Sequence, residues 1–236
     1  MNIKNLITIA IMSFVLVSCN QDKSDTIMYL TGNIKGLKKG TLYIKKINDT
    51  LFTTLDSIVI DGNSSFKTTM KLGSPEMLYL FLNRGQSNNM DNYLLFFAEP
   101  GKITIETGIE NFAANVKITG SKNQELYEEY KKMIRKFNDE QLDLIEANFN
   151  AVKEENDYKI DSIKQKYDKL VQRRRRYAIN FALHNANYEI GPYIALVEAY
   201  DVHTKYLDTI KKAMTTQIAN SLYGKKLIEY IAGRVE

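Results

Sequence analysis

The feature that most constrains the fold is a long stretch without helix-breaking residues, because no glycine or proline occurs between Gly120 and Gly191. Glycine and proline are the residues that most strongly interrupt a helix. The same stretch is rich in Glu, Lys, Gln, Leu and Arg, which are good helix formers. The sequence therefore predicts an α-helical region over residues 121–236, organised as a hairpin or bundle.

Apolar residues in this region recur at alternating steps of three and four. The recurring positions are Leu126, Tyr130, Met133, Phe137, Ile145, Phe149, Val152, Ile160, Ile163, Tyr167 and Leu170. This spacing is typical of amphipathic helices that pack along a seam. Ser121 is the expected N-cap, with Gln124 at the capping-box position. The polar step 153–157 predicts a hairpin corner, and one long helix is the alternative. A second break is expected at 185–187, followed by shorter helices over 192–200 and 207–223.

The preceding residues, 27–120, follow a strand pattern instead. Short alternating or apolar segments lie between turn residues at 27–34, 41–47, 52–60, 66–72, 77–82, 93–98, 102–107 and 114–119. Asp61-Gly62 and Pro100-Gly101 are turn dipeptides between such segments. Six to eight strands at this spacing predict a small antiparallel β-sandwich or open barrel. The expected class is therefore α+β, with a β domain followed by helices.

The N-terminus carries the pattern of an export signal. Lys4 precedes an apolar run from Leu6 to Val17 that only Thr8 and Ser13 interrupt. Such a run is too short to cross a hydrocarbon core of about 30 Å as a helix, so it is predicted to be the apolar part of a signal peptide.

The run ends in Leu16-Val17-Ser18-Cys19, which resembles a bacterial lipobox. The resemblance implies cleavage between Ser18 and Cys19 and lipidation of Cys19, with 1–18 as the signal peptide and 19–26 as a tether. Acyl chains would anchor the protein to the membrane, since each buried CH₂ contributes about 0.8 kcal/mol. An ordinary secretory signal with an accidental cysteine is the alternative. Asn20 after the cysteine favours sorting of the protein to the outer membrane. The face of that membrane on which the protein lies is left open.

Composition removes several classes of chemistry. Cys19 is the single cysteine among 236 residues, which excludes an intrachain disulfide, a Cys-x-x-Cys pair and a multi-cysteine zinc site. The two histidines, His184 and His203, are expected to be structural, so no metal site is predicted. A net charge of +4 is too balanced for nucleic-acid binding. We find no catalytic constellation, expect no cofactor, and predict that the protein is not an enzyme.

The order of several short motifs resembles a known arrangement. They are Leu30-Thr31-Gly32-Asn33-Ile34-Lys35-Gly36, Asp56-Ser57, Asp61-Gly62, Phe66, Glu99-Pro100-Gly101, Thr119-Gly120-Ser121, Phe181 to Tyr193 and Ser221-Leu222-Tyr223-Gly224-Lys225. The chain is thus similar to the domain of unknown function and helical region that precede the thioredoxin domain of TlpA/ResA-like lipoproteins. The resemblance implies an envelope location and this architecture. The resemblance implies no redox role for this chain, because the chain has no cysteine after Cys19.

The strongest local charge feature is the run Arg173, Arg174, Arg175 and Arg176, which follows Lys164, Lys166 and Lys169. Docking to an anionic surface is the functional interpretation. The alternative is a solvated helix, because consecutive residues point about 100° apart around a helix. Most aromatic residues are expected to pack in cores.

Three functions follow from these features. The first is a membrane-tethered envelope lipoprotein that acts as a non-enzymatic binding module with a protein partner. The second is an accessory, or truncated partner, of a thioredoxin-like oxidoreductase. The third is capture of a small ligand or glycan by the β domain, with the loop 83–92 as a mobile rim.

Overall fold

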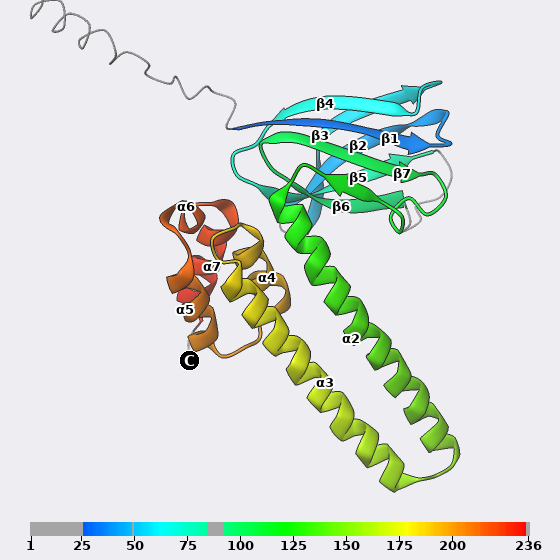
Figure 1. Ribbon diagram of the computed structural model, residues 1–236, viewed down its shortest axis with the longest axis vertical. Coiled ribbons are helices and arrows are strands. Elements are labelled where there is room, and N and C mark those ends of the chain that lie inside the picture. Colours follow the sequence, from blue (N-terminus) through cyan, green and yellow to red (C-terminus); the bar gives the residue numbers. More distant parts are fainter. Residues whose placement is uncertain (1–25, 49, 85–91, 235–236) are drawn as a thin grey trace, which may run out of the picture.

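The computed structural model describes residues 26–48, 50–84 and 92–234. Within these ranges the chain forms strands and then helices (Figure 1). The strands are β1 (Ile27–Lys35), β2 (Lys39–Asn48), β3 (Leu51–Asp61), β4 (Ser65–Lys71), β5 (Glu76–Asn83), β6 (Tyr93–Ala98), β7 (Gly101–Gly108) and β8 (Lys117–Thr119). The helices are α2 (Lys122–Lys153), α3 (Asp157–His184), α4 (Ile190–Glu198), α5 (Thr204–Ala213), α6 (Thr216–Ala219) and α7 (Leu222–Ala232). The predicted α+β class is confirmed.

The strands form a sandwich of two four-stranded sheets. One sheet has the order β4-β1-β7-β8 and the other has the order β3-β2-β5-β6. The predicted antiparallel sandwich is confirmed, and its sheets contain one parallel pair, β1 with β7. These two strands are far apart along the chain, so no hairpin turn forces them to run in opposite directions.

The sandwich core is mainly aliphatic and follows the alternation of the strands. Met28 and Leu30 of β1 and Leu78 and Leu80 of β5 are fully buried. Residues between them in the sequence point to the outer faces, as strand geometry requires. The inner faces of the two sheets therefore bury their side chains against each other.

The helices α2 and α3 form an antiparallel hairpin that extends away from the sandwich like an arm (Figure 1). The hairpin prediction is thus confirmed at the expected corner, and the single long helix is wrong. Glu155 has a φ of 51°, and the Asn156 side chain accepts a hydrogen bond from Lys159 N. The chain reverses at Glu155, and Asn156 caps the start of α3.

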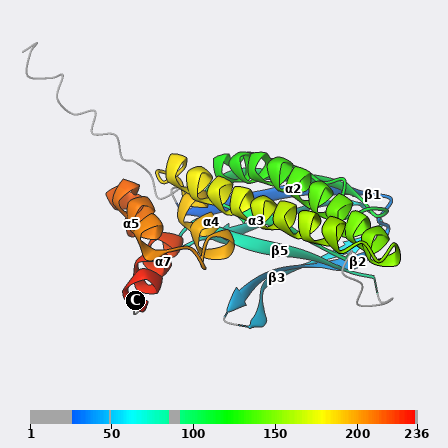
Figure 2. The same cartoon turned by 90° about the horizontal axis from the view of Figure 1, so that it is seen from below.

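The four short helices pack beside the sandwich end of α3 (Figures 1 and 2). The break at 185–187 is confirmed, because α3 ends at His184. The segment predicted as one helix over 207–223 forms parts of three helices. Thr215 and Ser221 each cap a new helix start by accepting a backbone N–H, so the chain turns at both positions.

A second core lies between the helices and the outer face of the sheet that contains β6. Phe97 of β6 is fully buried there, and its ring contacts those of Tyr193 and Tyr223 at centroid distances of 6.0 and 6.1 Å. Tyr223 also accepts a hydrogen bond from Met77 N. The aromatic side chains therefore join the sandwich to the helical region.

Candidate functional site

The N-terminus of α2 is held to the sandwich by buried polar side chains. Ser121 Oγ accepts a hydrogen bond from Gln124 N at 2.9 Å, so the predicted N-cap is confirmed. Gln124 does not use its side-chain oxygen to complete the capping box. Its Oε1 accepts from Phe97 N of β6 at 2.7 Å instead, and Gln124 is fully buried. The glutamine therefore ties the helix to the sheet.

Asn123 connects three elements at the same junction. Its Nδ2 donates to Glu99 Oε2 at 2.6 Å and to Glu189 Oε2 at 3.2 Å, while its Oδ1 accepts from Ile190 N at 3.0 Å. Burial raises the pKa of the Glu189 carboxyl, and the hydrogen bond from Asn123 opposes part of that rise. Glu99, Asn123 and Glu189 together orient the arm and α4 relative to β6.

Two of the short motifs noted in the sequence therefore have a structural explanation at this junction. Glu99-Pro100-Gly101 supplies an acceptor for the first turn of α2, since Glu99 Oε1 accepts from Lys122 N. Thr119-Gly120-Ser121 supplies the cap and a tight turn. Gly120 has a φ of 96°, and a Cβ there would lie 1.9 Å from Lys102 O, so no larger residue fits.

The four consecutive arginines of α3 contact different partners. Arg173 pairs with Glu140 of α2, Arg174 with Glu198 of α4, and Arg175 with Asp201 in the turn after α4. Arg176 Nε donates to the backbone oxygen of Gln172, and within the described residues its guanidinium makes no ion pair. Three of the four arginines therefore help to pack α3 against neighbouring segments, while Arg176 stays on an exposed side of α3. Contact of these arginines with an anionic surface stays a prediction.

A groove of about 780 Å³ lies on that side of α3, between it and α5. Its lining comes from both sides and from the α4–α5 turn: Gln172, Arg175, Arg176, Ile179, Asn180, Leu183, Asp201, Val202, His203, Tyr206 and Thr209. The groove thus combines two predicted arginines with one predicted histidine and with several apolar side chains that sequence reasoning did not single out.

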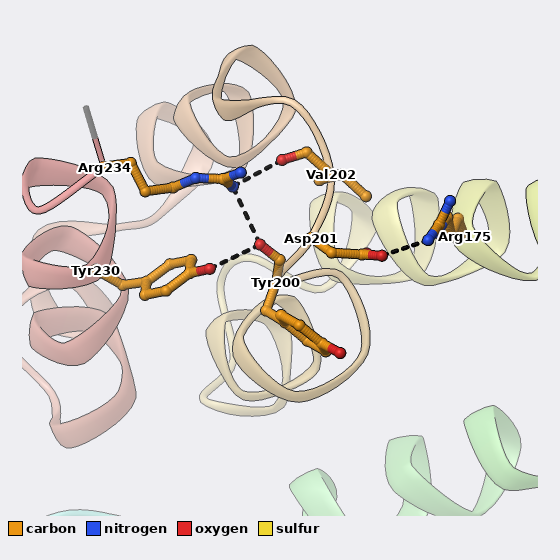
Figure 3. A network of polar contacts seen from close by, with 6 residues as sticks. All are labelled: Arg175, Tyr200, Asp201, Val202, Tyr230 and Arg234. Carbon is orange, nitrogen blue, oxygen red and sulfur yellow. Dashed lines mark hydrogen bonds and ion pairs between the residues drawn. The ribbon is translucent and has the colours of Figure 1, made fainter. Parts of the chain in front are cut away.

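The α4–α5 turn that borders this groove is fixed from both sides (Figure 3). Arg175 reaches Asp201 from α3. Arg234 donates to Tyr200 O at 3.0 Å and to Val202 O at 2.7 Å, and Tyr230 Oη donates to Tyr200 O at 2.8 Å. Two guanidinium groups and a phenol therefore hold the groove in shape.

Both histidines have roles at helix ends. His184 is the last residue of α3, and its Nδ1 lies 2.8 Å from Asn180 O. His203 caps α5, because its Nδ1 accepts from Lys205 N at 3.2 Å. Among the residues that the structure describes, no group of three or more His, Cys, Asp or Glu side chains is placed to hold a metal ion.

The free end of the arm exposes a row of large apolar side chains on α2, which we call the arm stripe. It consists of Leu142, Ile145, Phe149 and Val152, whose exposed fractions are 63%, 53%, 58% and 53%. The sequence interpretation assigned Ile145, Phe149 and Val152 to the helix seam, which is wrong for Phe149 and Val152, while Ile145 is half exposed at the edge of the seam. Ala151 is buried instead, and Phe137 contacts Tyr177 of α3 at a centroid distance of 6.0 Å.

The arm stripe borders a shallow apolar groove of about 320 Å³ between the two helices. Leu144, Ile145 and Asn148 line it from α2, and Ile160, Ile163, Lys164 and Tyr167 line it from α3. The steps of 3, 4 and 3 within the arm stripe match the a and d positions of a heptad. Side chains with this spacing lie on one face of a helix.

Cys19 and the predicted signal peptide lie outside the described residues, as do residues 85–91 of the predicted loop rim. Lipidation and the rim therefore stay predictions. Across 26–48, 50–84 and 92–234, no helix combines the length and apolar character needed to cross a bilayer.

The fold and its surfaces define an α+β protein in which a β-sandwich carries a helical arm and a cluster of short helices. Residues 28–127 match the model of a family described as a domain of unknown function (DUF4369). The matched part runs from the second residue of β1 through the sandwich to Tyr127 of α2. No curated protein of similar sequence matches the chain.

Proposed function

We propose that the protein is a lipid-anchored component of the bacterial cell envelope that acts as a non-enzymatic binding module. In this proposal Cys19 carries the anchor, the sandwich serves as the rigid base, and the arm binds a protein partner through an amphipathic helix. The partner belongs to the envelope, because the predicted signal peptide exports the chain.

The arm stripe is the observation that carries the proposal. Large apolar side chains gathered on one exposed face mark interaction surfaces, because contact with water is unfavourable for them. Their heptad spacing suits a partner helix that lays its own apolar face along α2. The buried polar junction at the other end would hold the arm in a defined direction.

Site-specific photocrosslinking in living cells tests the partner. A photoreactive residue in place of Leu142 should capture an envelope protein, and the capture should disappear when Phe149→Glu is added. Val59→Glu is the matched control, because Val59 is an apolar residue of β3 that is 75% exposed. It should leave the crosslink intact.

The identity of the crosslinked product separates the alternatives. Capture of a thioredoxin-like protein with a Cys-x-x-Cys pair would support the accessory role. Crosslinks only between two copies of this chain, or crosslinks that survive Phe149→Glu, would contradict the proposal.

The anchor has its own test. Cys19→Ala should move the protein from the membrane fraction to the soluble fraction and abolish labelling by radioactive palmitate. Ser24→Ala, in the predicted tether, should change neither result. Full membrane retention of Cys19→Ala would refute lipidation at this residue.

A further inference from the structure

We propose that the groove between α3 and α5 binds a single-chain amphiphile whose head group is a carboxylate or a phosphate. The groove is formed by residues 172–183 of α3 and 201–209. It shares no lining residue with the arm stripe, so this inference does not depend on the proposed partner binding.

The charge of the groove favours an anion. Its lining includes two arginines and one aspartate. Asp201 is paired with Arg175, which leaves the charge of Arg176 uncompensated among the described residues. A guanidinium binds a carboxylate or phosphate through short charge-assisted hydrogen bonds. Among the described residues only Nε of Arg176 donates a hydrogen bond, so its terminal nitrogens can bind an anion. The Asn180 amide lies in the same groove and can add a donor.

The rest of the lining suits an alkyl chain. Ile179 and Leu183 project from successive turns of α3, Val202 is buried in the turn, and Tyr206 of α5 is 42% exposed. The apolar side chains thus come from both sides of the groove. A volume of about 780 Å³ is within the range of small-molecule sites, which is roughly 300–1,000 Å³.

The groove is also formed in advance of binding. Tyr230 of α7 and Arg234, which follows α7, hold the α4–α5 turn from one side, while Arg175 holds it from α3 (Figure 3). A ligand would find its walls already placed, so little binding free energy would be lost in ordering them.

Methyl NMR of the full chain shows where each ligand binds and compares the affinities of the ligands. Octanoate, octyl phosphate and octanol are titrated separately into protein labelled at the methyl groups of Ile, Leu and Val. We expect both anions to shift the methyl signals of Ile179, Leu183 and Val202 and to bind about tenfold more tightly than octanol, because only the anions engage Arg176. Preference for octanoate would indicate a fatty acid, and preference for octyl phosphate would indicate a lipid phosphate.

Two variants and one control make the test decisive. Arg176→Gln should reduce the affinity for both anions to that for octanol. Tyr206→Ser, at an exposed position, should weaken all three ligands without affecting folding. Arg173→Gln is the matched control, since Arg173 pairs with Glu140 away from the groove. Equal affinity for octanol and the anions, shifts at other methyl groups, or equal losses in Arg173→Gln and Arg176→Gln would overturn the proposal.

Discussion

Both ends of α2 depart from the usual rule that apolar side chains are buried and polar side chains are exposed. At its start, Asn123 and Gln124 are buried, with exposed fractions of 3% and 0%. Near its end, Ile145 and Phe149 are more than half exposed. The same helix thus buries amides at the sandwich and presents large apolar groups to solvent at the arm.

The difference suggests separate roles for the two ends of α2: one orients the arm, and the other is available for binding. A buried amide is tolerated only when its donors and acceptors are paired, so the junction specifies one orientation of the arm. An exposed apolar side chain contributes little to the stability of its own fold. Its removal from water lowers the free energy only when another surface covers it. The junction therefore positions parts of this chain, and the arm stripe is the surface that we propose a second molecule covers.

The largest effect is expected when the junction loses its central amide. Asn123→Ala should lower the free energy of unfolding by about 3 kcal/mol, because Glu99, Glu189 and Ile190 N all lose a hydrogen-bond partner, two of them carboxylates. Urea unfolding followed by circular dichroism measures the change. Asn150→Ala, near the exposed end of the same helix, is the control and should stay within about 0.5 kcal/mol of the parent. Similar losses for both variants would remove the distinction between the two ends.

A smaller effect on stability is expected at the arm. Phe149→Glu should change the free energy of unfolding by no more than about 0.5 kcal/mol, since the ring is 58% exposed. Leu170→Ala on the opposite helix should cost about 3 kcal/mol, because Leu170 is only 3% exposed. Thermal and urea unfolding of the two variants compare the exposed face of the arm with its packed face. A cost for Phe149→Glu as large as that for Leu170→Ala would mean that the ring belongs to the core.

The smallest effect concerns pH. The pKa of Glu189 is raised in the folded state, mainly by burial, so the folded protein binds a proton at a pH where the unfolded chain does not. Stability should therefore rise as the pH falls through the folded pKa, and it should level off near the ordinary glutamate pKa of about 4.3. Glu189→Gln should remove this contribution to the slope and leave that of Glu76, whose pKa burial also raises, so the stability of the variant relative to the parent is greatest at neutral pH.

Melting temperatures of the parent and Glu189→Gln between pH 4.5 and 7.5 measure the difference. A constant offset across this range would show that Glu189 is not the group responsible.

The sequence alone determined the local elements. The strands lie within about three residues of the predicted ranges because strand alternation and turn dipeptides act over short distances. The corner was predicted from the polar step 153–157 and the cap from Ser121, and both depend on local contacts, since Asn156 and Ser121 accept hydrogen bonds from backbone groups three residues away.

Only the tertiary structure decided which surfaces meet. The parallel pairing of β1 with β7, the bond from Phe97 N to Gln124, and the groove that joins Arg176 to Tyr206 all connect segments that are distant in sequence. The distal half of α2 carries the arm stripe and, beside it, Leu144 and Ala151, and periodicity cannot tell which of the two sets faces α3. That choice is made by the packing of whole helices, in which a rotation of a fraction of a turn buries one row and leaves the other exposed.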